Sequence, residues 1–177
     1  MSTQKRLLFK IIVVGDGGVG KSTMIQRLTT DRFIPQKITI GTDLATIDIT
    51  TEKALVKLQI WDFGGEKRFR FFLPNYCRGA QGCLLCYDIT RYPSFDNLRE
   101  WYQIVHENAS DPVFILVGGK SDMAEEKRVV AQDDALNFKD KHNLDYIYET
   151  SSLTGENNRI LFETLTKGII EKRNIHL

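Results

Sequence analysis

The fold is decided by LFKIIVVGDGGVGKSTMIQRLTT, residues 8–30. This stretch begins with an apolar run typical of a buried strand, passes through a glycine-rich segment, and ends with apolar residues at helical spacing. Its centre, residues 15–22, matches the pattern G-x-x-x-x-G-K-[ST]. Glycines let backbone N–H groups turn inward around phosphate oxygens, and the positive end of the following helix strengthens that attraction. The stretch therefore predicts a phosphate-binding loop between a strand and a helix.

Two side chains at the end of this motif supply further chemistry. Lys21 reaches the terminal phosphates of a nucleoside triphosphate, and Ser22 offers a hydroxyl to Mg²⁺. The alternative, a glycine turn with a chance lysine, does not explain why the motif follows a strand and opens a helix. The residues expected to bind phosphate and metal here are Gly17, Gly18, Val19, Gly20, Lys21, Ser22 and Thr23.

Strand-like and helix-like runs alternate along the rest of the chain. Apolar runs that suit buried strands occupy residues 8–15, 82–88, 112–118 and 145–149. Runs of alternating polarity that suit a hairpin occupy residues 43–49 and 54–62. Helical patterns cover residues 21–30, 94–108, 130–143 and 156–173, with Ser94 as the expected N-cap of the second. The order predicts an α/β three-layer sandwich with a mostly parallel six-stranded sheet and one antiparallel edge strand. Ligands of such sheets bind beyond the carboxyl ends of the strands.

Length and charge place the chain in a broad class. With 177 residues and a net charge of +1, we expect one domain over residues 1–177, with short tails at 1–7 and 174–177 and no nucleic-acid partner. We expect no secretory signal and no spanning helix, and hence a cytoplasmic protein. Cys83 and Cys86 lie in a strand-like run, where residues three apart face opposite ways, so we interpret them as core thiols. The three histidines are interpreted as surface residues.

Six segments together carry a resemblance to a known family. They are GDGGVGKS, TIGTD, WDFGGEKRF, NYCRGAQG with YDIT, GGKSD and ETSS, in this order. Their order and spacing resemble the small GTPases of the Ras superfamily, and most of all the Rab branch, from Phe9 to Gly168. The resemblance implies a single G domain that binds Mg²⁺ with GTP as substrate and GDP as product.

The resemblance also implies a set of metal and phosphate ligands. Thr39 corresponds to the threonine of the first switch that coordinates Mg²⁺ and senses the terminal phosphate, with nearby Thr42 as its rival. Asp62 corresponds to the aspartate that holds Mg²⁺ through water, beside Ser22. The N–H of Gly65 corresponds to the one that meets the terminal phosphate.

A second implied set reads the base. Asp122 would accept two N–H bonds from guanine, and adenine offers no such pair, so an unpaired buried carboxylate would oppose adenine. Lys120 would lie along the base, and Phe33 would stack on its edge, unless Phe33 is a loop aromatic that plugs the core. The remaining members of this set are Ser151, Ser152 and Leu153.

The sequence departs from the family pattern at three places. Gly119 replaces an asparagine that bonds the base and the phosphate loop, a loss of roughly 1–3 kcal/mol. Glu66 replaces the catalytic glutamine, and an ionised glutamate accepts a hydrogen bond from water but cannot donate one. Phe63 and Gly64 stand where threonine and alanine are common, and Phe63 is expected to pack under the switch. The expected catalytic residues are Glu66, Lys21 and Gly65, and hydrolysis would be slow, assisted by a partner, or altered in its pH dependence.

Partners and alternatives follow from the same resemblance. Effector proteins are expected at residues 33–49 and 65–76, together with an exchange factor and a GTPase-activating protein. The chain has no C-a-a-X box, so either a lipidated tail for peripheral membrane association has been removed or the protein works without an anchor. A GTP-binding scaffold with little or no hydrolysis is the main alternative function. An ATP-using kinase would leave Asp122 unexplained.

Overall fold

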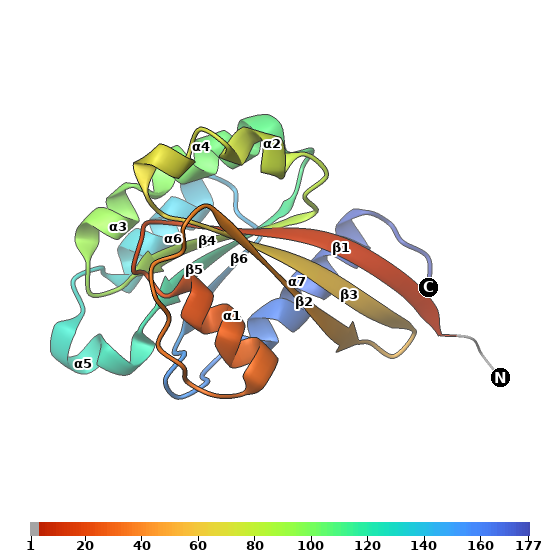
Figure 1. The fold of residues 1–177 in the computed structure, drawn as a ribbon, viewed down its shortest axis with the longest axis horizontal. Helices are drawn as coiled ribbons and strands as arrows, with labels where there is room; N and C mark the ends of the chain where they lie inside the picture. The colour runs from red at the N-terminus through yellow and green to blue at the C-terminus, as the bar shows by residue number, and fades with distance from the viewer. Residues whose placement is uncertain (1–3) are drawn as a thin grey trace.

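A computed structural model describes residues 4–177 and shows a twisted sheet covered by helices on both faces (Figure 1). The strand order is β2-β3-β1-β4-β5-β6. The strands are β1 (Lys5–Val14), β2 (Thr42–Thr50), β3 (Ala54–Phe63), β4 (Gly82–Asp88), β5 (Val113–Gly119) and β6 (Tyr146–Thr150). All neighbouring strands are parallel except β2, which pairs antiparallel to β3 at one edge. The predicted fold class is therefore confirmed.

The helices divide between the two faces of the sheet. The main ones are α1 (Lys21–Thr30), α2 (Leu73–Cys77), α3 (Tyr92–Asp96), α4 (Leu98–Asn108), α6 (Gln132–Lys141) and α7 (Asn158–Lys172). Helices α1 and α7 pack on one face, where Met24 and Phe162 join the apolar side chains of β1 and β3. Helices α2, α3, α4 and α6 cover the other face, around Trp101 and Phe63. Short helical turns η1 (Lys67–Phe69), η2 (Ser121–Met123) and α5 (Ala124–Lys127) complete the chain.

Three local predictions were wrong. The helical pattern at 94–108 forms two helices divided at Asn97, and the first begins at Tyr92 because Pro93 suits a first helical turn. Ser94 is consequently a buried residue inside α3 rather than its N-cap, and its hydroxyl donates to the carbonyl of Arg91 at 2.6 Å. Residues 5–7, expected in a tail, belong to β1. The other tail residues 1–3 lie outside the described part of the chain.

The packing of these layers buries the cysteines and partly buries one histidine. Cys83 and Cys86 are free thiols on opposite faces of β4, as predicted, and burial raises the pKa of Cys86 to about 12. His142, expected at the surface, is half-buried between the rings of Tyr102 and Phe138, at centroid distances of 4.6 and 4.4 Å. Its Nε2 is buried without a hydrogen-bond partner among residues 4–177.

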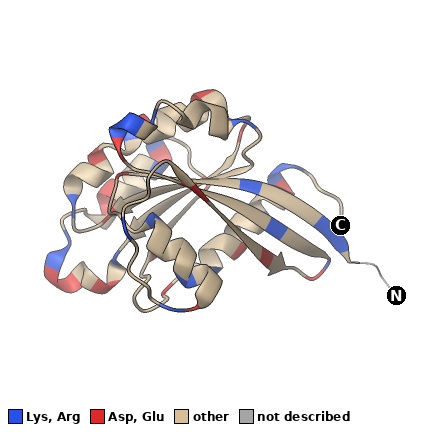
Figure 2. Ribbon diagram, viewed as in Figure 1, with Lys and Arg blue, Asp and Glu red and all other residues tan. Residues whose placement is uncertain are grey.

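The surface carries both signs of charge. Figure 2 shows Lys and Arg interspersed with Asp and Glu along the helices, in keeping with a net charge of +1. Within residues 4–177, every helix is too short or too polar to cross a membrane.

Candidate functional site

A cavity of about 300 Å³ opens at the carboxyl ends of the parallel strands. It is formed by the phosphate-binding loop with the start of α1, by the segment before β2, and by the loops that follow β5 and β6. Of the residues expected to bind nucleotide, only Ser151 does not line it. The expected residues that do are Gly17, Gly18, Val19, Gly20, Lys21, Ser22, Thr23, Phe33, Thr39, Gly65, Lys120, Asp122, Ser152 and Leu153.

Lys21 holds the phosphate-binding loop from within. Its Nζ donates to the carbonyl oxygens of Gly15 at 2.9 Å and Asp16 at 3.0 Å. The side chain is buried, and this burial lowers the pKa of the Lys21 ammonium, while nearby Asp62 opposes the shift. A buried ammonium at the floor of the cavity favours an anionic ligand there, because such a ligand would replace the lost hydration.

Two further cations bond the outward carbonyls of the same loop. Arg91 donates from Nη2 to Gly17 O at 2.6 Å, and Lys120 donates from Nζ to Gly18 O at 3.2 Å. Phosphate oxygens require the N–H groups of such a loop, and cations bonded to its carbonyl oxygens do not compete for those N–H groups. Arg91 could not be predicted from the sequence, because no motif links the loop after β4 to the phosphate-binding loop.

Three oxygen-bearing side chains converge beside this loop. Ser22 Oγ lies 2.6 Å from Thr39 Oγ1, and both contact Asp62 Oδ2, Ser22 closely and Thr39 at 3.4 Å. Asp62 is buried, and this burial raises the pKa of its carboxyl. The Oδ1 atom of Asp62 has no hydrogen-bond partner among residues 4–177. Hydroxyl and carboxylate oxygens with a spare buried lone pair fit a hard cation such as Mg²⁺.

The rival threonine lies elsewhere. Thr42 belongs to β2, where it pairs with Phe63, so Thr39 is the threonine that the structure brings to Asp62. Phe63 is fully buried and packs edge-on to Tyr76, as expected for a residue under the switch.

Glycines let the segment after β3 touch its neighbours. A Cβ added to Gly65 would lie 2.0 Å from the backbone nitrogen of Gly17. A Cβ added to Gly64 would lie 2.7 Å from the carbonyl oxygen of Thr39. The N–H of Gly64 also donates to Gly41 O at 2.7 Å. The segments 39–41 and 62–65 therefore meet the phosphate-binding loop in one closed arrangement.

The end of the cavity formed by the loops after β5 and β6 carries polar and charged side chains. Ser151 Oγ donates to Asp122 Oδ1 at 2.7 Å, which orients the carboxylate although Ser151 does not line the cavity. Lys120 pairs with buried Asp88 at 2.7 Å. Burial alone would raise the pKa of the Asp88 carboxyl, but hydrogen bonds from Lys120 and Thr90 hold it below its ordinary value. Apolar and polar lining residues that the sequence analysis did not predict include Met24, Cys86, Tyr87, Val117, Met123 and Thr150.

Gly119 lines the cavity without filling it. A Cβ at this position would lie 3.1 Å from the carbonyl oxygen of Val19 in the phosphate-binding loop. A longer amide side chain could therefore bond that loop, provided the Val19 carbonyl yields by a few tenths of an ångström. With glycine, the hydrogen bond from Lys120 Nζ to Gly18 O joins the loop after β5 to the phosphate-binding loop.

Glu66 is the third predicted catalytic residue, after Lys21 and Gly65, which line the cavity. It is absent from the cavity lining, and its carboxylate pairs with Arg68 Nε at 2.7 Å. The Arg68 side chain is 66% exposed and the Glu66 side chain 38%, so water reaches the pair, which contributes little stability and can open.

A fold of this class, with this cavity at its strand ends, invites comparison with known proteins. A model of the Ras family matches residues 10–171. The chain belongs to the Ras family. Ras-related protein RABA2a of Arabidopsis thaliana is 39% identical over 173 residues, which cover 95% of this chain and 79% of that protein. GTP-binding protein ypt3 of Schizosaccharomyces pombe is 41% identical, with 89% of this chain and 74% of that protein covered.

A third relative points to the same branch of the Ras family. Ras-related protein Rab-11A of Dictyostelium discoideum is 41% identical over 160 residues, again 89% of this chain and 74% of that protein. The resemblance to Rab proteins inferred from the motifs is thus confirmed.

Proposed function

We propose that this protein is a guanine-nucleotide-dependent switch that binds GTP and GDP with Mg²⁺ and hydrolyses GTP slowly. The strongest support is the meeting of Ser22, Thr39 and Asp62 beside the phosphate-binding loop, with one buried Asp62 oxygen unpaired among residues 4–177. At the opposite end of the cavity, Asp122 is held by Ser151, as a reader of guanine N–H groups requires.

Each group of residues has a distinct part in this proposal. The N–H groups of residues 17–22 and the positive end of α1 would bind the phosphates, and Lys21 would neutralise their charge. Ser22, Thr39 and Asp62 would hold Mg²⁺, which would draw charge from the phosphate oxygens. The N–H of Gly65 would bond the terminal phosphate, while Lys120, Asp122, Ser152, Leu153 and Phe33 would enclose the base.

Glu66 decides how fast hydrolysis would be. To position a water, its carboxylate must leave Arg68 and turn toward the cavity, where it could accept a hydrogen bond but not donate one. This requirement favours a second candidate function, a GTP-binding scaffold with little or no hydrolysis.

Two measurements on the purified protein test both functions. Nucleotide released by acid denaturation should be GDP for a switch that turns over, and retained GTP would support the scaffold; ATP or ADP would overturn both. Single-turnover GTP hydrolysis by the wild type and Glu66→Gln should then be compared between pH 6 and 9. We expect the glutamine variant to be faster, and identical profiles would show that Glu66 does not act on the water.

Partner proteins are proposed at the two segments that close the site. Within residues 33–49 and 65–76, Ile38, Ile40, Phe71 and Phe72 are exposed apolar side chains, 68%, 73%, 83% and 51% respectively. Such a surface, ordered by the terminal phosphate, suits effector proteins, and an exchange factor and a GTPase-activating protein would act on the same segments. We propose a cytoplasmic location, with peripheral membrane association if a lipidated tail is present.

A further inference from the structure

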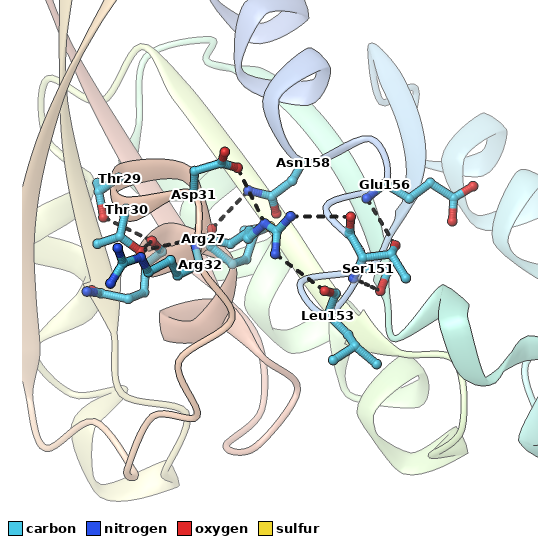
Figure 3. Close-up of polar contacts among 12 residues, drawn as sticks. Arg27, Thr29, Thr30, Asp31, Arg32, Ser151, Leu153, Glu156 and Asn158 are labelled. Atoms are coloured by element: carbon cyan, nitrogen blue, oxygen red, sulfur yellow. Dashed lines mark hydrogen bonds and ion pairs between the residues drawn. The ribbon is translucent and has the colours of Figure 1, made fainter.

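Arg27 joins the last turn of α1 to the loop after β6. Its Nη1 donates to Leu153 O and its Nη2 to Thr154 O, both at 3.3 Å, and its side chain is 19% exposed (Figure 3). Its Nε also lies 3.7 Å from the exposed carboxylate of Asp31. Arg27 does not line the cavity, so it can affect a bound nucleotide only through the residues that it holds.

The loop that Arg27 holds is the one that orients the base reader. The N–H of Thr154 donates to Ser151 Oγ at 3.1 Å, and that hydroxyl in turn donates to Asp122 at 2.7 Å. The N–H of Gly155 donates to Ser151 O at 2.8 Å, which closes the turn. Movement of the carbonyls bonded to Arg27 would therefore reach the Asp122 carboxylate through two hydrogen bonds.

A second contact links α1 to the far side of the same loop. Asn158, at the start of α7, is buried, and its Nδ2 donates to the carbonyl of Met24 at 3.1 Å. Met24 lies one turn before Arg27 in α1, so the helix that begins at the phosphate-binding loop contacts both ends of residues 153–158 (Figure 3).

Gly155 shows how closely the guanidinium and the loop approach. Its φ of +84° lies in the left-handed region, and an added Cβ would be 2.6 Å from Arg27 Nη2. A side chain at this position would push the guanidinium away from the loop carbonyls. The position thus provides an independent way of breaking the same contact.

We propose that Arg27 is a positioning residue that keeps the base-enclosing loop on the nucleotide and thereby slows nucleotide release. This inference rests on the proposed function, because it requires a guanine base between Asp122 and residues 151–153. Leaving the cavity requires the base to displace that loop, and the two hydrogen bonds to Leu153 and Thr154 oppose the displacement. Entry follows the same path in reverse and also requires the loop to open, so Arg27 should slow both release and association.

The test uses the full chain and a fluorescent GDP carrying a methylanthraniloyl group. Arg27→Ala should release this nucleotide about 5- to 20-fold faster than the wild type, which is what losing long, partly exposed hydrogen bonds to a charged donor would produce. The association rate constant should also rise, while the number of binding sites should stay unchanged. Arg27→Lys, which keeps a cation but loses the fork, should be intermediate. A purely structural defect would instead reduce the number of binding sites.

A double-mutant cycle separates this contact from other effects of the loop. Gly155→Ala should speed release in the wild type. It should add less in an Arg27→Ala background, where the clash with Nη2 no longer exists and only the strain of alanine at a φ of +84° remains. The matched control is Arg159→Ala, which removes an exposed arginine paired with Glu163 on α7. It should change release by less than about twofold, because such a surface pair contributes little.

The outcomes are distinct. Wild-type protein that fails to retain the labelled GDP would overturn both the proposed function and this inference. Retention by the wild type with an unchanged release rate in Arg27→Ala, or with additive effects in the cycle, would overturn the inference alone.

Discussion

Gly119 is a position in this site where a longer side chain could add a contact. Its lack of a side chain leaves the loop after β5 without a direct bond to Val19, although the Cβ position points at that carbonyl from 3.1 Å. The phosphate-binding loop and the base-enclosing loops are therefore joined by fewer contacts than their proximity permits.

Gly119→Asn should tighten GDP binding. An amide that donates to Val19 O and to the base would add roughly 1–3 kcal/mol, or about 5- to 150-fold in affinity. Isothermal titration with GDP measures the change. Gly119→Ala is the control, since it adds the Cβ without a donor and should give no gain. An asparagine variant that binds no better than the alanine variant would contradict the expectation.

Individual residues differ in how well the sequence predicts them. Thr39 could be chosen over Thr42 from the local TIG pattern, and the structure agrees in placing it against Ser22. The pairing of Glu66 with Arg68 could not be predicted, because a weak exposed ion pair leaves no pattern in the sequence. Arg91 and Arg27 bond carbonyls of segments distant in the chain, and backbone acceptors carry no residue signature.

At the scale of elements, helix α4 is bonded to the phosphate-binding loop through Asp16. Trp101 Nε1 donates to Asp16 Oδ1 at 2.9 Å and Asn97 Nδ2 donates to Oδ2 at 2.7 Å. Arg70, from the segment after β3, lies 4.4 Å over the Trp101 ring and 3.5 Å from the same carboxylate. The Asp16 carboxylate thus connects the phosphate-binding loop, helix α4 and the segment 65–76.

Asp16→Ala should destabilise the fold by about 1–3 kcal/mol, because the buried Trp101 N–H would lose its acceptor. Urea unfolding at saturating GDP measures the effect. Asp96→Ala, which removes an exposed partner of Arg99, is the matched control and should stay within about 0.5 kcal/mol. Equal effects of the two variants would show that Asp16 does not support α4.

The contact between α4 and α6 should make stability depend on pH. Burial, together with Lys141, Arg99 and His106, lowers the pKa of His142 below that of the unfolded chain. The unfolded state therefore binds a proton first as pH falls, and stability should decline below about pH 6.5 until the lower folded pKa is passed.

His142→Gln should flatten this decline. Urea unfolding of both proteins between pH 8 and 5 gives the comparison, with His176→Gln as a control at an exposed histidine. If the wild type and His142→Gln lose stability in parallel, His142 is not the group responsible.

Most strands and helices could be predicted from the sequence. The boundary between α3 and α4 shows why some could not. Strands such as β4 and helices such as α1 have continuous apolar or helical patterns, and they fold where those patterns lie. The division between α3 and α4 falls at Asn97, whose side chain bonds Asp16 from another part of the chain. A contact of that kind cannot be read from local periodicity.

At the scale of the whole molecule, one edge of the sheet carries the candidate function. The loops after β1, β3, β5 and β6 all contribute to the cavity or to the cluster of Ser22, Thr39 and Asp62, as expected for the carboxyl ends of parallel strands (Figure 1). A mostly parallel sheet, with ligands expected beyond the carboxyl ends of its strands, could be predicted from the sequence, and the position of the cavity needs no knowledge of side-chain contacts.

Two nearby residues after β3, Phe71 and Leu73, should differ strongly in how much they contribute to stability. Phe71→Ala should change the free energy of unfolding by less than about 0.5 kcal/mol, because the ring is 83% exposed. Leu73→Ala, at a fully buried position, should cost about 2–5 kcal/mol. Chemical denaturation of the two variants makes the comparison. A large loss in Phe71→Ala would mean that its ring packs against the protein in solution.

The position of Trp101 has a practical consequence. This indole is one of two in the chain, is fully buried, and touches both the Asp16 carboxylate and the Arg70 guanidinium. Charged neighbours of this kind shift and quench indole emission, so withdrawal of Arg70 would alter the signal without an attached dye. The protein therefore carries its own optical reporter, placed where the segment after β3 meets the phosphate-binding loop.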